Sequence, residues 1–218
     1  MIAVIDYGAG NLRSIRRALE AAGSETVVTA DPAVVAQADA VVLPGVGAAA
    51  HAMDRLNELG MTPVVRDAVA AGKPFLGICL GMQILFEHQE EGDSHGLGLL
   101  RGRVRSLVPD AATKVPHIGW NRSRVVAPGP LGAAGDERHY YFVHSYVVEP
   151  DDPADVAAET DYGVPFPSVV VRNNIWGTQF HPEKSGPDGL ALIAAFVAVA
   201  GECTPVPEPE PVAAGSAR

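Results

Sequence analysis

A cysteine set between two glycines is the part of this sequence best suited to covalent chemistry. Residues 77–83 read Gly-Ile-Cys-Leu-Gly-Met-Gln and directly follow the apolar residues 75–76. A strand that ends in Gly-x-Cys-x-Gly is typical of a nucleophile elbow, where the chain turns sharply into a helix, and glycines allow the tight reversal. The N–H groups at the start of that helix favour a thiolate. We therefore expect Cys79 to be a nucleophile.

A second run offers a base and a carboxylate. Residues 177–185 read Gly-Thr-Gln-Phe-His-Pro-Glu-Lys-Ser, so that a strand delivers His181 at its end and Glu183 follows two residues later. The carboxylate can reach back and orient the imidazole. A lone cysteine is more often a small buried side chain, and His-Pro-Glu alone is more often an ordinary strand exit. Together, the two runs predict the catalytic triad Cys79, His181 and Glu183.

Backbone donors are also expected near the nucleophile. A thiolate that attacks a carbonyl group needs hydrogen-bond donors for the oxyanion that develops. The N–H of Leu80, directly after the cysteine, is one such donor, and the loop Pro44-Gly45-Val46-Gly47 offers a second from Val46 or Gly47. The alternative for this loop is a plain turn that needs the flexibility of glycine. A phosphate-binding loop is disfavoured, because the spacing fits neither the dinucleotide-binding nor the Walker pattern.

The composition indicates a globular protein with an acidic surface. The chain has 218 residues, of which 47% are hydrophobic and 19% charged, with a formal net charge of −10. This charge disfavours nucleic acid or an anionic membrane as a partner. Two cysteines, Cys79 and Cys203, do not make a secreted disulfide framework, so a reduced cytoplasmic protein is expected. The seven histidines lack metal-site spacing, and we expect neither a metal nor a cofactor.

The elements that must position these residues follow two patterns. Over the first ~90 residues strands alternate with helices, which predicts an α/β fold with a doubly wound, mostly parallel sheet flanked by helices. The expected strands are 1–6, 26–29, 40–43 and 75–76, and the expected helices are 12–22, a stretch ending near 59, and 64–71. No signal peptide and no apolar run of the ~20 residues that span a membrane is seen.

After residue 99 the strands follow one another without helices, which predicts an antiparallel extension of the sheet. The expected strands are 103–108, 123–127, 140–143, 147–149, 168–172 and 175–179, with a hairpin turn at Asn173-Asn174. A last amphipathic helix carries Leu190, Ile193 and Val197. We expect one domain over residues 1–203 and a disordered tail, rich in Pro, Glu and Ala, over residues 204–218.

These runs resemble a known family. The elbow and residues 179–183 are similar to the class I, triad-type glutamine amidotransferases. Residues 6–11, 44–47, 116–121 and 141–146, together with Glu183-Lys184-Ser185, resemble more narrowly the glutaminase subunits of imidazole glycerol phosphate synthase, in histidine biosynthesis. The resemblance covers residues 1 to about 200 and leaves the tail outside.

The resemblance implies a reaction and a partner. Cys79 would attack the side-chain amide of glutamine, release ammonia and leave a thioester that water hydrolyses to glutamate. The partner implied is a (β/α)8-barrel cyclase subunit that uses the ammonia and forms a heterodimer with this chain. Glutamine binding is assigned by position to Gly47, Gln83, Glu91, Ser145 and Tyr146. Partner contacts are assigned in the same way to Asn11, Trp120, Asn121, Tyr141 and Lys184.

The residues alone leave some of these roles open. Gln83 can equally be a helix surface residue, Glu91 a solvated acid and Trp120 a packing residue. His144 is either a hydrogen-bonded core histidine or a site residue, and we keep it outside the triad because no carboxylate follows it.

Three other functions remain as alternatives. The first is another class I amidotransferase, for anthranilate or carbamoyl phosphate synthesis, which would lack the Gly-Trp-Asn and Phe-Val-His-Ser-Tyr runs of this sequence. The second is a stand-alone cysteine peptidase or hydrolase, which activity on peptides without a partner would favour. The third is a non-catalytic interaction module, against which the intact triad counts.

Overall fold

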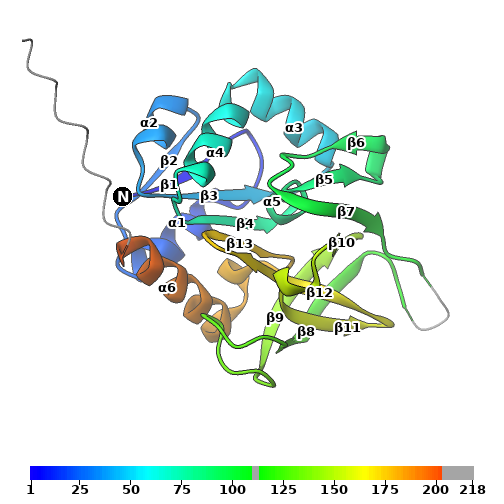
Figure 1. The fold of residues 1–218 in the computed structure, drawn as a ribbon. Coiled ribbons are helices and arrows are strands. Elements are labelled where there is room, and N and C mark those ends of the chain that lie inside the picture. Colours follow the sequence, from blue (N-terminus) through cyan, green and yellow to red (C-terminus); the bar gives the residue numbers. More distant parts are fainter. Residues whose placement is uncertain (110–112, 203–218) are drawn as a thin grey trace, which may run out of the picture.

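The computed structural model describes residues 1–109 and 113–202 of the chain. They form a nine-stranded sheet in the order β2-β1-β3-β4-β13-β12-β11-β8-β9, with helices on both faces of its parallel part (Figure 1). The α/β prediction is confirmed. The tail predicted at residues 204–218 and the domain end predicted at residue 203 lie outside the described residues.

Five parallel strands make up one half of this sheet. They are β2 (Thr26–Thr29), β1 (Ile2–Ile5), β3 (Ala40–Gly45), β4 (Phe75–Cys79) and β13 (Ile175–Thr178). All except β2 are buried along their whole length, which explains the continuous apolar runs of the sequence. Strand β3 continues to Gly45, two residues beyond the predicted end at residue 43, because its pairing with β4 extends to Cys79.

Helices cover the two faces of the parallel strands. On one face lie α1 (Leu12–Ala21) and α6 (Gly186–Glu202), packed through Ile15 and Phe196 against Val4 of β1. On the other lie α2 (Pro32–Gln37), α3 (Ala49–Glu58) and α4 (Met61–Ala70). Helix α2 was not predicted, because a six-residue helix with one buried side chain, Val35, shows no periodicity. None of the helices in the described part of the chain has the length and hydropathy that crossing a bilayer requires.

Beyond β13 the sheet continues with antiparallel strands, as predicted. They are β12 (Val164–Arg172), β11 (Val156–Tyr162), β8 (His117–Val125) and β9 (Glu137–His144). Asn173 takes the left-handed conformation, with φ 53°, at the predicted hairpin turn. Strand β11 was missed, and β8 begins at His117, earlier than the predicted residue 123, because both stretches mix polar residues into the strand pattern.

A second, four-stranded sheet was not predicted. It has the order β10-β7-β5-β6 and consists of β10 (Tyr146–Pro150), β7 (Leu100–Ser106), β5 (Phe86–Gln89) and β6 (Ser94–His95). The predicted strands at 103–108 and 147–149 therefore belong to this sheet and not to the extension of the main sheet. Phe86 and Val148 of this sheet join the same core as α3 and α4, so it covers one side of the elbow.

Candidate active site

The carboxyl ends of three neighbouring parallel strands meet at one edge of the main sheet. Gly45, at the end of β3, pairs with Cys79, at the end of β4, and β13 runs beside β4 and leads three residues further to His181. In open α/β sheets ligands bind outside this edge. The topology therefore brings the elbow, the glycine loop and the His-Pro-Glu run together from distant parts of the sequence.

The elbow depends on close backbone contacts. Cys79 has φ 56° and ψ −110°, a conformation that is uncommon for a residue with a side chain and that occurs most often at functional sites. A Cβ at Gly81 would lie 1.9 Å from the Leu43 carbonyl oxygen, and one at Gly77 would lie 2.5 Å from the Gly81 carbonyl oxygen. Both glycines are thus required by space. The helix that follows, α5 (Leu80–Gln83), has a single turn, so its dipole is smaller than that of the helix expected here.

His181 and Glu183 form a buried hydrogen-bonded pair. The distance from His181 Nδ1 to Glu183 Oε1 is 3.0 Å, and the side chains are 4% and 0% exposed. Nε2 is buried without a well-oriented hydrogen-bond partner among the described residues. Burial lowers the pKa of His181, but the hydrogen bonds and charges of Cys79 and Glu183 outweigh burial and raise it to about 9. The imidazole is thus poised to hold a proton between the thiol and the carboxylate.

Two polar groups that the sequence analysis did not assign contact the sulfur. The amide Nε2 of Gln179 lies 3.8 Å from Cys79 Sγ, and the thiol lies 3.9 Å from the Val143 carbonyl oxygen. Gln179 is fully buried directly after β13, inside the run that carries His181. The sequence places Gln179 two residues before the proposed base, but only the fold shows that its amide is buried against the sulfur.

Ser185, also unassigned, fixes the backbone of the base. Its hydroxyl donates to the His181 carbonyl oxygen at 2.6 Å and accepts from the Tyr141 N–H at 2.9 Å. The His181 N–H in turn donates to the Tyr141 carbonyl oxygen at 3.0 Å. These contacts attach the His-Pro-Glu turn to β9.

A cavity of about 540 Å³ opens beside Cys79 and His181. Its volume falls within the ~300–1,000 Å³ that is usual for small-molecule sites. Its wall contains the predicted glutamine-binding and oxyanion residues, namely Val46, Gly47, Leu80, Gln83, Glu91, Ser145 and Tyr146. His144 lines the cavity as well and is also buried. It can therefore be both a hydrogen-bonded core histidine and a residue of the site.

Two of these wall residues have fixed side chains. Gln83 is buried, and its Nε2 donates to the Tyr146 carbonyl oxygen and to Gln179 Oε1, both at 3.1 Å. Glu91 accepts a 3.0 Å hydrogen bond from the Ala49 N–H at the start of α3. The readings of Gln83 as a surface residue and of Glu91 as a fully solvated acid are therefore wrong.

The residues whose backbone groups are expected to bind an oxyanion line the same cavity as Cys79. Leu80 is the first residue of α5, and Val46 and Gly47 follow β3. Burial raises the pKa of the Tyr7 hydroxyl to about 12. The charge of Cys79 raises this pKa further, whereas the Val46 backbone lowers it. The Tyr7 hydroxyl lies beside Gly45, and Tyr7 is a buried residue that the sequence did not single out.

A directional hydrogen-bond chain runs behind the cavity. His144 Nδ1 lies 2.8 Å from the Tyr146 carbonyl oxygen, His117 Nδ1 lies 2.9 Å from His144 Nε2, and Asn121 Nδ2 lies 3.4 Å from His117 Nε2. Since the carbonyl can only accept, His144 carries its proton on Nδ1, and His117 does the same. Burial lowers the pKa of His117 to about 4 and, with smaller contributions from neighbouring groups, that of His144 to about 3. Both rings are neutral.

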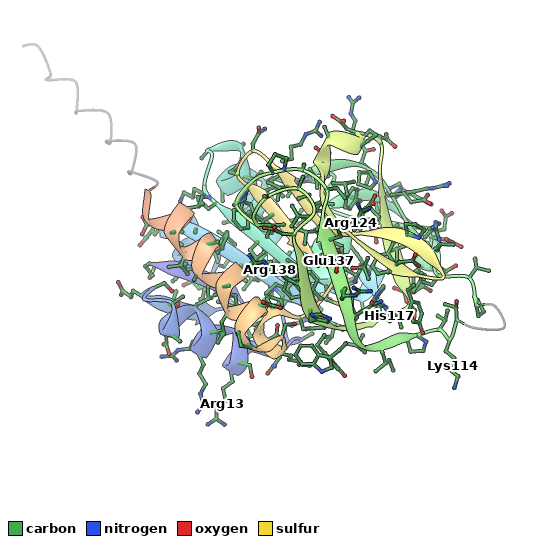
Figure 2. All side chains as sticks on the ribbon, turned by 90° about the horizontal axis from the view of Figure 1, so that it is seen from below. Arg13, Lys114, His117, Arg124, Glu137 and Arg138 are labelled. Atoms are coloured by element: carbon green, nitrogen blue, oxygen red, sulfur yellow. The ribbon has the colours of Figure 1, made fainter. Side chains whose placement is uncertain are left out.

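An exposed apolar patch lies beside the triad. Ile118 and Trp120 are each 59% exposed on the same face of β8, and the Trp120 ring packs edge-on against Tyr141, with ring centroids 6.2 Å apart. The indole also reaches the backbone of Gly186, at the start of α6. Arg13 projects outward from α1 (Figure 2).

Four of the five predicted partner-contact residues gather around the turn at Pro182–Lys184. Asn11 starts α1 without capping it by its side chain and instead directs Nδ2 to Glu183 Oε1, at 3.5 Å. Lys184 is exposed on the turn itself. Asn121 is the exception, because neighbouring residues of a strand face opposite ways; its amide donates to the Asp161 carbonyl oxygen at 2.9 Å. This hydrogen bond links β8 to β11.

Within the described residues, no three His, Cys, Asp or Glu side chains come together in a way that would hold a metal ion.

Comparison with known proteins agrees with this geometry. The profile of the family "Glutamine amidotransferase class-I" matches residues 3–200. Subunit HisH of imidazole glycerol phosphate synthase from Aromatoleum aromaticum is 52% identical over 208 residues, which cover 90% of this chain and 97% of the relative. The HisH subunit from Geobacillus kaustophilus is 49% identical over 205 residues, with 92% and 97% covered.

Solved structures share the fold at lower identity. A crystal structure of a glutamine amidotransferase has a TM-score of 0.73 and 21% identity, and covers 92% of this chain and 100% of its own. The structure of PurLQS from Thermotoga maritima has a TM-score of 0.69 and 20% identity, with 91% and 97% covered. With an elbow cysteine, a paired histidine and carboxylate, and a profile match over nearly its whole length, the chain belongs to the class I glutamine amidotransferase family.

Proposed function

We propose that this chain is the glutaminase subunit of an imidazole glycerol phosphate synthase and that it passes ammonia to a cyclase subunit. One observation carries the proposal: Cys79 and the His181–Glu183 pair lie at the ends of adjacent strands and open onto one cavity of about 540 Å³. The high identity to HisH subunits from two distant bacteria supports this member of the family over the alternatives.

In the first step the Cys79 thiolate attacks the side-chain amide carbon of glutamine. The C–N bond is weakened as a tetrahedral intermediate forms, and its negative oxygen requires donors. We assign this role to the N–H of Leu80 and one N–H of the Val46–Gly47 segment, which line the same cavity as Cys79. The positive φ of Cys79 supports its role as the nucleophile, because the sharp turn leaves Cys79 lining the cavity.

His181 moves the protons. As the tetrahedral intermediate collapses, Nε2–H protonates the departing nitrogen, and ammonia leaves behind a γ-glutamyl thioester. The neutral imidazole then takes a proton from water, which attacks the thioester, and glutamate is released with the thiolate restored. Glu183, at 3.0 Å from Nδ1, orients the ring and stabilises its charged form.

The cavity wall suits a free amino acid, which carries a positive ammonium group and a negative carboxylate group. Glu91 is the only carboxylate among the described residues of the wall, so we assign it to the ammonium group of glutamine. The described wall contains no lysine or arginine, which leaves backbone N–H groups near Gly47, Ser145 and Tyr146 for the carboxylate group. Gln83 supports the wall by holding Tyr146 at 3.1 Å.

A docked partner is expected from the chemistry of the product. Free ammonia is protonated in neutral water and loses the lone pair that makes it a nucleophile, so a donor works best in direct contact with its acceptor. We propose that Asn11, Trp120, Tyr141 and Lys184 contact the (β/α)8-barrel cyclase subunit in a heterodimer. The exposure of Trp120 and its closeness to the triad turn support this surface. We further place the protein in the cytoplasm, where a free Cys79 stays reduced.

Ammonia release from glutamine, measured with and without the cyclase subunit, tests the proposal. We expect glutamate and ammonia in equal amounts and a higher kcat when the cyclase subunit is present. An anthranilate synthase partner serves as the control and should have no effect. Hydrolysis of peptides without any turnover of glutamine would contradict the proposal.

A further inference from the structure

We infer that Gln179 is a positioning residue for Cys79, whose amide N–H donates to the sulfur and favours the thiolate. This inference rests on the proposed function, in which that thiolate attacks glutamine. The contact is the 3.8 Å approach of Gln179 Nε2 to Cys79 Sγ.

The orientation of the amide follows from its neighbours. The Tyr146 carbonyl oxygen can only accept, so the group of Gln83 that lies 3.1 Å from it must be the NH₂. The second hydrogen of that NH₂ points to Gln179, which must present its oxygen, at 3.1 Å. The NH₂ of Gln179 is therefore turned to the sulfur. With the amide flipped, the NH₂ groups of Gln179 and Gln83 would face each other, and neither could accept a hydrogen bond.

Burial makes this arrangement stiff. Gln179 is 0% exposed, and its backbone N–H donates to the Ser168 carbonyl oxygen at 2.9 Å. Turning the amide away from the sulfur would leave a buried donor unpaired, which is costly. The side chain thus holds a fixed donor against the nucleophile and joins it, through Gln83, to the wall of the cavity.

The donor acts differently on the states of the sulfur. A thiolate accepts a charge-assisted hydrogen bond, whereas a thiol or thioester sulfur accepts weakly. Gln179 therefore stabilises the thiolate relative to the thiol and the thioester. The other titratable groups that face the sulfur are His181 and Tyr7, and neither is altered when Gln179 is replaced.

Two replacements separate the donor from the rest of the side chain. Gln179→Met keeps length and volume but removes both polar groups. Gln179→Glu keeps the oxygen that Gln83 needs and replaces the donor by a second oxygen, so it preserves the network around α5. Gln89→Met is the matched control, because Gln89 is equally buried and donates to the Gln83 and Phe86 carbonyl oxygens without contacting the sulfur.

The measurement is the pH dependence of alkylation of Cys79 by iodoacetamide, made on the full chain with Cys203→Ser so that a single cysteine remains. We expect the midpoint pH to rise by about 1 in Gln179→Met, equivalent to ~1.4 kcal/mol, and by more in Gln179→Glu because of its charge. Gln89→Met should keep the wild-type midpoint. Midpoints equal to wild type in both folded Gln179 variants, or in Gln179→Glu if it alone folds, would overturn the inference.

Failure of this inference is distinct from failure of the proposed function, since alkylation requires neither glutamine nor a partner. An unchanged midpoint together with normal glutamine hydrolysis refutes the role of Gln179 alone. Raised midpoints in the Gln179 variants, together with no glutamine turnover by the wild-type chain in the presence of the cyclase subunit, would support the role of Gln179 and refute the proposed function. In the complex, kcat should fall in Gln179→Met at neutral pH while KM stays constant.

Discussion

Acidification from pH 8 to pH 5 should destabilise this protein through its two buried neutral histidines. His117 and His144 share one hydrogen-bond chain that ends at the Tyr146 carbonyl oxygen. A proton added to His144 would set two N–H groups against each other across the 2.9 Å contact, and a proton added to His117 would oppose the Asn121 NH₂ at 3.4 Å. Burial lowers their pKa values to about 4 and about 3, below the ordinary 6.5.

The sign and size of the effect follow from linkage. Below pH 6.5 the unfolded chain binds protons at both residues while the folded chain does not, so stability is lost as pH falls from 6.5 towards 4. At pH 5 each histidine contributes ~2 kcal/mol to this loss, or ~4 kcal/mol for the pair, relative to pH 8. Other groups add a background that is common to all variants.

Urea unfolding at pH 8 and pH 5 measures this loss. His117→Gln retains a donor for His144 and an acceptor for Asn121 but does not titrate, so it should lose ~2 kcal/mol less than wild type between the two pH values. His139→Gln, at an exposed position of β9, is the matched control and should follow wild type. An identical pH dependence in His117→Gln and wild type would refute the reasoning.

Three further substitutions test other parts of the structure. Glu183→Gln should reduce kcat for glutamine less than His181→Ala, because it weakens the orientation of the base without removing it; equal losses would contradict the assigned roles. Gly81→Ala should lower the free energy of unfolding by ~2–3 kcal/mol, since its Cβ would lie 1.9 Å from the Leu43 carbonyl oxygen, and an unchanged Tm would disprove this. Trp120→Ala should weaken cyclase binding by ~1–2 kcal/mol in calorimetry without lowering Tm, and an unchanged Kd would exclude it from the interface.

The main elements of the site could be predicted because local sequence specifies them. Continuous apolar runs mark the buried parallel strands, and parallel strands align their carboxyl ends, so residues at the ends of β3, β4 and β13 must be neighbours. The Cys79 elbow and the His181 turn follow from that rule. The contact of His181 with Glu183 is local and spans two residues.

What could not be predicted depends on contacts between distant segments. Gln179 and Ser185 have ordinary polar side chains whose roles appear only when Cys79, Tyr141 and the turn are assembled around them. The pairing of His117 with His144 depends on the register of β8 with β9. The second sheet was missed because β5 and β7 are parallel neighbours, a relation that single-sequence patterns do not encode.

The central claim, that Cys79 supplies the ammonia used by the partner, is tested most directly in the assembled complex. Synthase activity of a complex that carries Cys79→Ala should be measured once with glutamine and once with a high concentration of ammonium salt at alkaline pH. The account predicts that activity with glutamine is lost and that activity with ammonium equals wild type, because only the source of ammonia is removed. Activity with glutamine in the Cys79→Ala complex would contradict it.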